Sequence, residues 1–223
     1  EDGTNNIEQV DLLTNGGQML TTWTPGARAF HEMVSIPGSG LTAAGATPLG
    51  EHYYYLRVRL AGGALAYSAP IWLRNYTRVP AEMPHGYTMT AANSPYLVSG
   101  TVHVPAGTTL TMQAGTVVKF LDGSSVIEVD GAILAQGTSG SPVCFSSLKD
   151  DAAGGDTNGD GGGSVPAAGD WGRVHLRSGS SGGFEHCILR YGQDRALYCD
   201  HAAAVSLTNC SISTSAGDGI YAV

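Results

Sequence analysis

Oxygen-bearing side chains recur at alternate positions in one short stretch of this sequence. Asp156, Asn158 and Asp160 are each separated by one residue, and the glycines of the stretch permit a sharp bend. This spacing matches the first half of an EF-hand loop, in which alternate positions supply oxygen ligands to calcium. The stretch therefore predicts a Ca²⁺ site, to which the backbone carbonyl of Gly162 could add a ligand.

The second half of the EF-hand pattern is missing. Its twelfth position, where a glutamate is expected, holds Ala167. Because calcium takes about 6–8 oxygen ligands, acidic residues near the ends of the loop must complete the site, and Asp150, Asp151 and Asp170 are the candidates. The alternative is that residues 149–170 form a solvated acidic loop without a metal.

The elements that position this loop show a repeat of 23 residues. Cys187–Leu189 aligns with Cys210–Ile212, and Leu197–Cys199 aligns with Ile220–Ala222. Each triplet reads apolar, variable, apolar, which indicates a short strand with one buried face. Short strands at a fixed period, separated by Gly, Ser, Asn and Asp, are typical of a solenoid. The sequence therefore predicts an all-β protein whose residues 96–223 form a right-handed parallel β-helix.

This interpretation gives about four to five coils, with the loop at 149–170 inserted between the second and third. The outer residues of each triplet should point inward, and the middle residues should face solvent. The predicted strands are 102–104, 110–112 and 118–120, then 127–129, 133–135 and 143–145, then 174–176, 184 and 187–189, then 197–199, 205–207 and 210–212, and finally 220–222.

Four outward positions of one predicted sheet align along the stack. They are Glu128, His175, Tyr198 and Tyr221. Such a ladder could contact a sugar or another surface. More often, such a ladder serves only to stabilise the face of the solenoid through ring contacts.

The N-terminal residues 1–80 have a different pattern. Tyr53–Leu60 and Ala66–Leu73 flank the turn Gly62-Gly63, which predicts a β-hairpin. We expect a small β-sandwich with Trp72 in its core, followed by a proline-containing linker at 81–95.

Two resemblances support this division. Residues 98–120, 146–151, 155–161, 169–172 and 189–192 resemble the right-handed β-helix modules of bacterial secreted and surface proteins. That resemblance implies an extracellular or cell-surface setting without implying a reaction, because such modules occur in lyases, adhesins and stalks. Residues 53–72 resemble the β-rich tail of metal-dependent phosphoesterases of the polymerase-and-histidinol-phosphatase type, although the catalytic barrel and its metal motifs are absent from this sequence.

Composition excludes several partners and sites. The 223 residues carry a formal net charge of −8 with only two lysines, so nucleic acid is not expected as a partner. The sequence contains no run of about 18 apolar residues, so membrane insertion is not expected.

The four cysteines lack zinc-finger spacing. Cys187 and Cys210 should face inward on stacked strands, either bonded or as free thiols. Cys144 should face outward, and the sequon at Asn75 is a candidate glycosylation site.

These features lead to one expected function and two alternatives. We expect an extracellular, non-catalytic structural or adhesive β-helix protein, self-associating head to tail through the open coil at its C-terminal end.

The chain begins at Glu1 without Met, and we interpret it as a processed product or as part of a longer chain.

The first alternative is a polysaccharide lyase or hydrolase. It would use a catalytic calcium with a nearby arginine, or a carboxylate pair drawn from Glu128, Asp194 and Asp200. The arginines near the loop are Arg173, Arg177, Arg190 and Arg195. The second alternative is an accessory part, either the carbohydrate-binding part of such a polysaccharide-active enzyme or a binding domain of a phosphoesterase whose catalytic barrel lies upstream.

Overall fold

The computed structural model describes residues 5–34, 51–201 and 204–223. The chain divides into two compact units. The first comprises residues 1–75 together with residues 158–161, and the second comprises residues 76–157 and 162–223. Residues 35–50, which are rich in Gly, Ala and Pro, lie outside the described residues.

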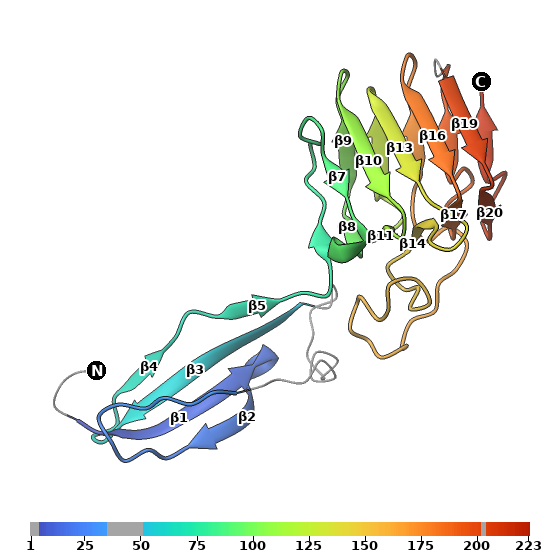
Figure 1. Cartoon of the computed structure of the whole chain (residues 1–223). Coiled ribbons are helices and arrows are strands. Elements are labelled where there is room, and N and C mark those ends of the chain that lie inside the picture. The colour runs from blue at the N-terminus through green and yellow to red at the C-terminus, as the bar shows by residue number, and fades with distance from the viewer. Residues whose placement is uncertain (1–4, 35–50, 202–203) are drawn as a thin grey trace. The chain divides into compact units, whose positions relative to one another are not determined.

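The N-terminal unit is built on one antiparallel sheet in the order β2-β1-β3-β4, with β5 also pairing with β3 (Figure 1). Its strands are β1 (Ile7–Thr14), β2 (Gln18–Trp23), β3 (His52–Leu60), β4 (Leu65–Tyr67) and β5 (Ile71–Leu73). The predicted hairpin is present: β3 and β4 pair across Gly62 and Gly63, which both adopt positive φ angles. Only a residue without Cβ adopts such angles without strain.

Trp72 does not lie in a core, which corrects our expectation. Its side chain is 48% exposed, and it lies opposite Tyr53 on the antiparallel sheet. The described residues of this unit contain one sheet and no second sheet packed against it. Trp72 therefore has no facing layer within the described residues.

The second unit is a parallel β-solenoid built from three sheets (Figure 1). Along the chain, successive strands from β7 onward belong to the three sheets in a fixed, repeating order. This order gives five coils, from β7–β9 to β19–β21, and β6 precedes the first coil. One sheet contains β7 (Thr88–Met89), β10 (Thr109–Gln113), β13 (Ala132–Gln136), β16 (Ser181–Glu185) and β19 (Ala204–Thr208). The second contains β6 (Thr77–Arg78), β8 (Tyr96–Val98), β11 (Val117–Phe120), β14 (Val143–Ser147), β17 (Cys187–Arg190) and β20 (Ser211–Ser213). The third contains β9 (Thr101–Val104), β12 (Val126–Val129), β15 (Val174–Leu176), β18 (Leu197–Cys199) and β21 (Ile220–Ala222).

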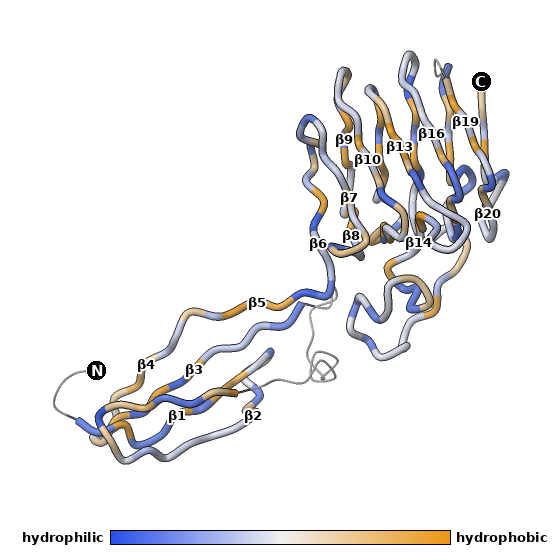
Figure 2. The backbone as a smooth tube through the Cα atoms, in the orientation of Figure 1, coloured by the Kyte–Doolittle hydropathy of each residue, from blue (hydrophilic) through white to orange (hydrophobic). Residues whose placement is uncertain are grey.

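The register confirms the 23-residue repeat. Leu189 pairs with Ile212, and Leu197 pairs with Ile220. All triplets predicted from 102–104 to 220–222 lie in or against strands of the solenoid. Figure 2 shows apolar positions concentrated along these strands and more hydrophilic positions in many of the turns.

Alternation within each strand builds one continuous core. The inward residues Ile127, Val174 and Leu197 follow one another in neighbouring coils, and each is fully buried. Trp171 stacks on Phe120, with ring centroids 4.1 Å apart. Its indole Nε1 donates a hydrogen bond to the carbonyl of Arg190 at 2.7 Å, so the one polar atom of this buried ring is paired.

The solenoid begins before residue 96. The segment 81–95, expected to be a linker, contains β7, which pairs with β10, and Glu82 forms a parallel bridge to His103. In addition, β6 pairs with β8 and β8 pairs with β11, so β6, β7 and β8 all lie ahead of the first predicted strand. These pairings are made by very short strands between prolines, whose sequence pattern resembles that of a loop.

Helices are nearly absent from the described residues, which contain the 3-10 turns η1 (Asn15–Gly17) and η3 (Ala91–Asn93). No helix among these residues is long and apolar enough to cross a membrane.

Candidate functional site

A long loop between β14 and β15 covers the outer face of the sheet that contains β11, β14 and β17. Figure 1 shows it as an irregular excursion from the stack of strands. Asp150 anchors its start, because its carboxylate accepts hydrogen bonds from Arg190 Nε at 2.8 Å and from the hydroxyl of Ser146. Asp150 is 2% exposed. A buried carboxylate needs such partners, so Asp150 serves loop docking.

The loop also changes the environment of outward-facing side chains on this sheet. Lys119 aligns with Leu97 and Ser146 on the outer face, yet it is fully buried. Its Nζ donates a hydrogen bond to the carbonyl of Gly155 at 2.7 Å. Burial lowers the pKa of Lys119 to about 8, although the nearby carboxylates of the loop oppose this shift.

Asp170 fastens the other end of the loop. Its carboxylate accepts hydrogen bonds from Ser147 Oγ at 2.7 Å, from Lys149 Nζ at 2.8 Å and from the backbone amide of Ala167 at 3.0 Å. Burial alone would raise the pKa of Asp170, but these hydrogen bonds outweigh it and hold the pKa below its ordinary value. Asp170 is therefore engaged within the protein.

Three of the predicted ligands converge in the middle of the loop. One carboxylate oxygen from each of Asp151, Asp156 and Asp160 lies within 4.8 Å of the others. The amide of Asn158 donates a hydrogen bond to Asp160 at 2.8 Å. Gly162 has a positive φ angle and lies beside Asp151: a Cβ added at Gly162 would lie 3.8 Å from an oxygen of Asp151.

This arrangement fits a hard cation. Three carboxylates held close together repel one another, and oxygen ligands of this kind are those that Ca²⁺ prefers. Asp151 belongs to this cluster, whereas Asp150 and Asp170 hold the ends of the loop. Of the three candidates for completing the ligand set, the geometry thus favours Asp151.

The outer ladder is assembled in register on the third sheet. Glu128 pairs with His175, His175 with Tyr198, and Tyr198 with Tyr221. The His175 and Tyr198 rings stack with centroids 4.5 Å apart, and the Tyr198 and Tyr221 rings are 5.6 Å apart. Burial lowers the pKa of His175, which favours its neutral form. Whether the ladder contacts a ligand stays a prediction.

Two features of this sheet were not predicted from the sequence. The guanidinium carbon of Arg195 lies 4.1 Å from the ring centroid of Tyr221, within the range of a cation–π interaction. His103 extends the ladder, because it pairs with Glu128 in the adjacent coil. The register between strands could have revealed His103, but the position of Arg195, in a turn, has no sequence signal.

The carboxylates considered for hydrolysis each lie beside a basic side chain. Glu128 binds Arg177 at 2.5 Å, and Asp200 binds His201 at 2.8 Å. Asp194 lies 3.7 Å from Arg195. Glu128 and Asp194 thus lie in ion pairs with arginines, and Asp200 shares a hydrogen bond with His201.

The cysteines of the solenoid are free thiols. Cys187 faces the core and is 1% exposed; burial and the neighbouring Cys210 raise its pKa. Cys144 is on the outer face as predicted but lies buried, and burial raises its pKa to about 11. A thiol with so high a pKa is a poor nucleophile near neutral pH.

The candidate glycosylation residue Asn75 is half-buried in a bend, and its modification stays a prediction.

Three parallel sheets wound around one core define a parallel β-helix protein. Residues 82–196 match the family model described as "Pectate-lyase like beta helix domain", and the chain belongs to this family. No curated protein and no solved structure matches the chain significantly. The family match does not extend to the N-terminal sheet, so the resemblance of residues 53–72 to a phosphoesterase tail stays a prediction.

Proposed function

We propose that this chain is a non-catalytic structural or adhesive β-helix protein of the extracellular space, stabilised by calcium bound to its long loop. The convergence of Asp151, Asp156 and Asp160 carries this proposal. A cation bound by these carboxylates would offset their mutual repulsion and order a loop that is rich in glycine. The bound ion would supply charge neutralisation and rigidity.

The anchors of the loop explain how calcium would act on the solenoid. Asp150 and Asp170 tie the two ends of the loop to β14, β17 and Lys149. A calcium ion that holds the middle of the same loop would keep this loop in place over buried Lys119. Calcium sites of extracellular modules bind with dissociation constants of roughly 0.1–1 mM, which suits a small ligand set.

Thermal unfolding with and without calcium tests the proposal. Calcium at ten times its dissociation constant should stabilise the parent protein by about 1.4 kcal/mol. Asp156→Asn combined with Asp160→Asn should abolish this gain, while Asp218→Asn, an exposed acid outside the loop, should retain it. An unchanged melting temperature of the parent, or an equal calcium effect in the double variant, would refute the proposal.

A polysaccharide contact along the outer ladder is the second candidate function. The aligned rings of His175, Tyr198 and Tyr221, with Arg195 over Tyr221, favour it. Calorimetry should detect binding of uronic-acid oligomers, and Tyr221→Ala should weaken that binding about tenfold, if ring contacts are worth ~1.4 kcal/mol. Tyr67→Ala, on the N-terminal sheet, is the matched control. Equal affinities of the two variants would eliminate this candidate.

A further inference from the structure

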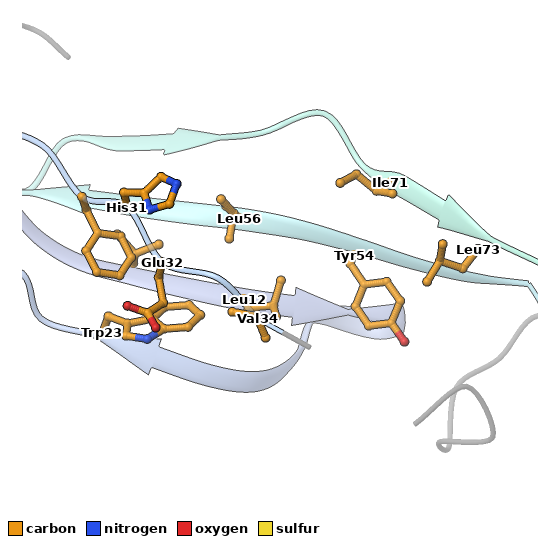
Figure 3. A pocket seen from close by; sticks show the side chains of 11 residues that line it. Leu12, Trp23, His31, Glu32, Val34, Tyr54, Leu56, Ile71 and Leu73 are labelled. Atoms are coloured by element: carbon orange, nitrogen blue, oxygen red, sulfur yellow. The ribbon is translucent and has the colours of Figure 1, made fainter. Parts of the chain in front are cut away.

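The N-terminal sheet carries a cavity that the β-helix function does not use. Its volume is about 370 Å³, and its walls come from β1, β2, β3, β5 and the segment after β2 (Figure 3). Val10 and Tyr54 are buried in its wall, with 3% and 5% exposure. Small-molecule sites commonly enclose roughly 300–1,000 Å³ and are largely apolar, so this cavity has the size and character of a binding site.

Apolar side chains around the cavity are exposed to an unusual degree. Ile71 is 67% exposed, Val34 44%, and Leu56 and Leu73 each 37%. Clustered apolar exposure on a folded protein marks a surface that binds something. The apolar wall can therefore accept the hydrocarbon body of a ligand.

The polar end of the cavity is negatively charged. Among the described residues of the lining, Glu32 is the one acidic side chain and there is no lysine or arginine; His31 lies next to Glu32. No hydrogen bond or ion pair joins Glu32 to another described residue. Trp23 and Phe30 add two aromatic rings with centroids 5.6 Å apart, and Figure 3 shows Glu32 and Trp23 at the same end of the cavity.

We propose that this cavity binds an organic cation with an apolar body, such as a substituted ammonium compound. The ammonium group would lie beside the Glu32 carboxylate and the negative ring faces of Trp23 and Phe30. The hydrocarbon body would lie against Val10 and Tyr54. An anion would be repelled by Glu32, and a neutral ligand would forgo both the ion pair and the cation–π contact.

Three ligands with nearly the same skeleton test this charge preference on the full chain. They are benzyltrimethylammonium, the neutral 2,2-dimethyl-3-phenylpropan-1-ol and the anionic 2,2-dimethyl-3-phenylpropanoate. Titration calorimetry should show saturable binding of the cation at least about fivefold tighter than the alcohol. The anion should bind more weakly than the alcohol.

Two variants and one control assign the site. Glu32→Gln should weaken cation binding about fivefold and leave the affinity of the alcohol unchanged, because only the charge is removed. Trp23→Leu should weaken cation binding about tenfold. Glu8→Gln removes an exposed acid that pairs with Arg59, outside the cavity lining, and should bind like the parent.

The exposed position of Glu32 makes Glu32→Gln the decisive variant, since its folding should be unaffected. Absence of saturable cation binding at millimolar concentrations would overturn the proposal. Equal binding of the cation and the alcohol, or an unchanged cation affinity in Glu32→Gln, would overturn it as well.

Discussion

His103 lies between two carboxylates at the start of the solenoid. Its Nδ1 is 3.0 Å from Glu82, and its Nε2 is 2.7 Å from Asp130. Only the protonated ring can donate to both acids. The hydrogen bond to Asp130 is the largest influence and raises the pKa of His103 above its ordinary value; burial opposes the rise and Glu82 adds to it.

This raised pKa predicts a pH-dependent contribution to stability. The contribution of His103 should be fully present below its unfolded-state pKa of about 6.5 and should be lost as pH rises through the higher folded-state pKa. The difference in melting temperature between the parent and His103→Gln should therefore shrink from about pH 5.5 to about pH 8.5. His85→Gln, at an exposed histidine, should give a small difference. A constant or growing His103 difference would contradict the assignment.

Individual residues also show where sequence reasoning succeeds. Alternation placed Lys119 and Cys144 on the outer face, and both lie there, but both are buried. Their cover comes from the loop that Asp150 docks onto Arg190, 40 residues further along the chain. Alternation along a strand reports the face on which a side chain lies, and it contains no information about a distant loop that covers that face.

At the scale of elements, stacked turns impose constraints that strand patterns do not reveal. Gly131 lies in the turn between β12 and β13, above the turn of the preceding coil. A Cβ added there would lie 2.2 Å from the carbonyl oxygen of Thr108 and 2.3 Å from that of Pro105. Both contacts are with backbone atoms, which cannot rotate away.

We therefore predict that Gly131→Ala destabilises the solenoid. Overpacking of this kind costs about 1–3 kcal/mol, and the rigid neighbours place this site at the upper end. Gly140→Ala is the matched control, because an added Cβ there meets nothing within 4 Å and no positive φ angle is involved. Urea unfolding should show a lower midpoint for Gly131→Ala alone. Equal midpoints for both variants would contradict the turn-stacking argument.

The elements that could be predicted are those that share the repeat. The shift that aligns Leu189 with Ile212 identifies neighbouring strands because stacked coils need apolar side chains at equivalent positions. β6 and β7 contain two residues each, which is too few to show alternation. The three converging aspartates were predictable from their spacing and the loop ends, whereas the choice of Asp151 over Asp150 depends on the Arg190 contact.

At the scale of the whole solenoid, stability depends on neighbours along the stack. Strands of the inner coils pair on both sides, whereas β19, β20 and β21 each pair on one side among the described strands. Leu207 and Ile220 in this last coil are 38% and 41% exposed, although equivalent positions in the preceding coils, Phe184 and Leu197, are buried. The three edges thus combine unpaired backbone groups with exposed apolar side chains.

Such edges favour pairing with another chain. We predict that a protein of these 223 residues self-associates through β19–β21, in a head-to-tail manner that does not close on itself. Sedimentation velocity should show a weight-average mass that rises with protein concentration. Leu207→Lys combined with Ile220→Lys places charges on the edge and should shift the protein to monomer, because burying unpaired lysines is costly. Leu65→Lys, at an exposed leucine of the N-terminal sheet, should associate like the parent. A parent protein that stays monomeric at every concentration, or a double variant that associates equally well, would show that these edges are not the contact.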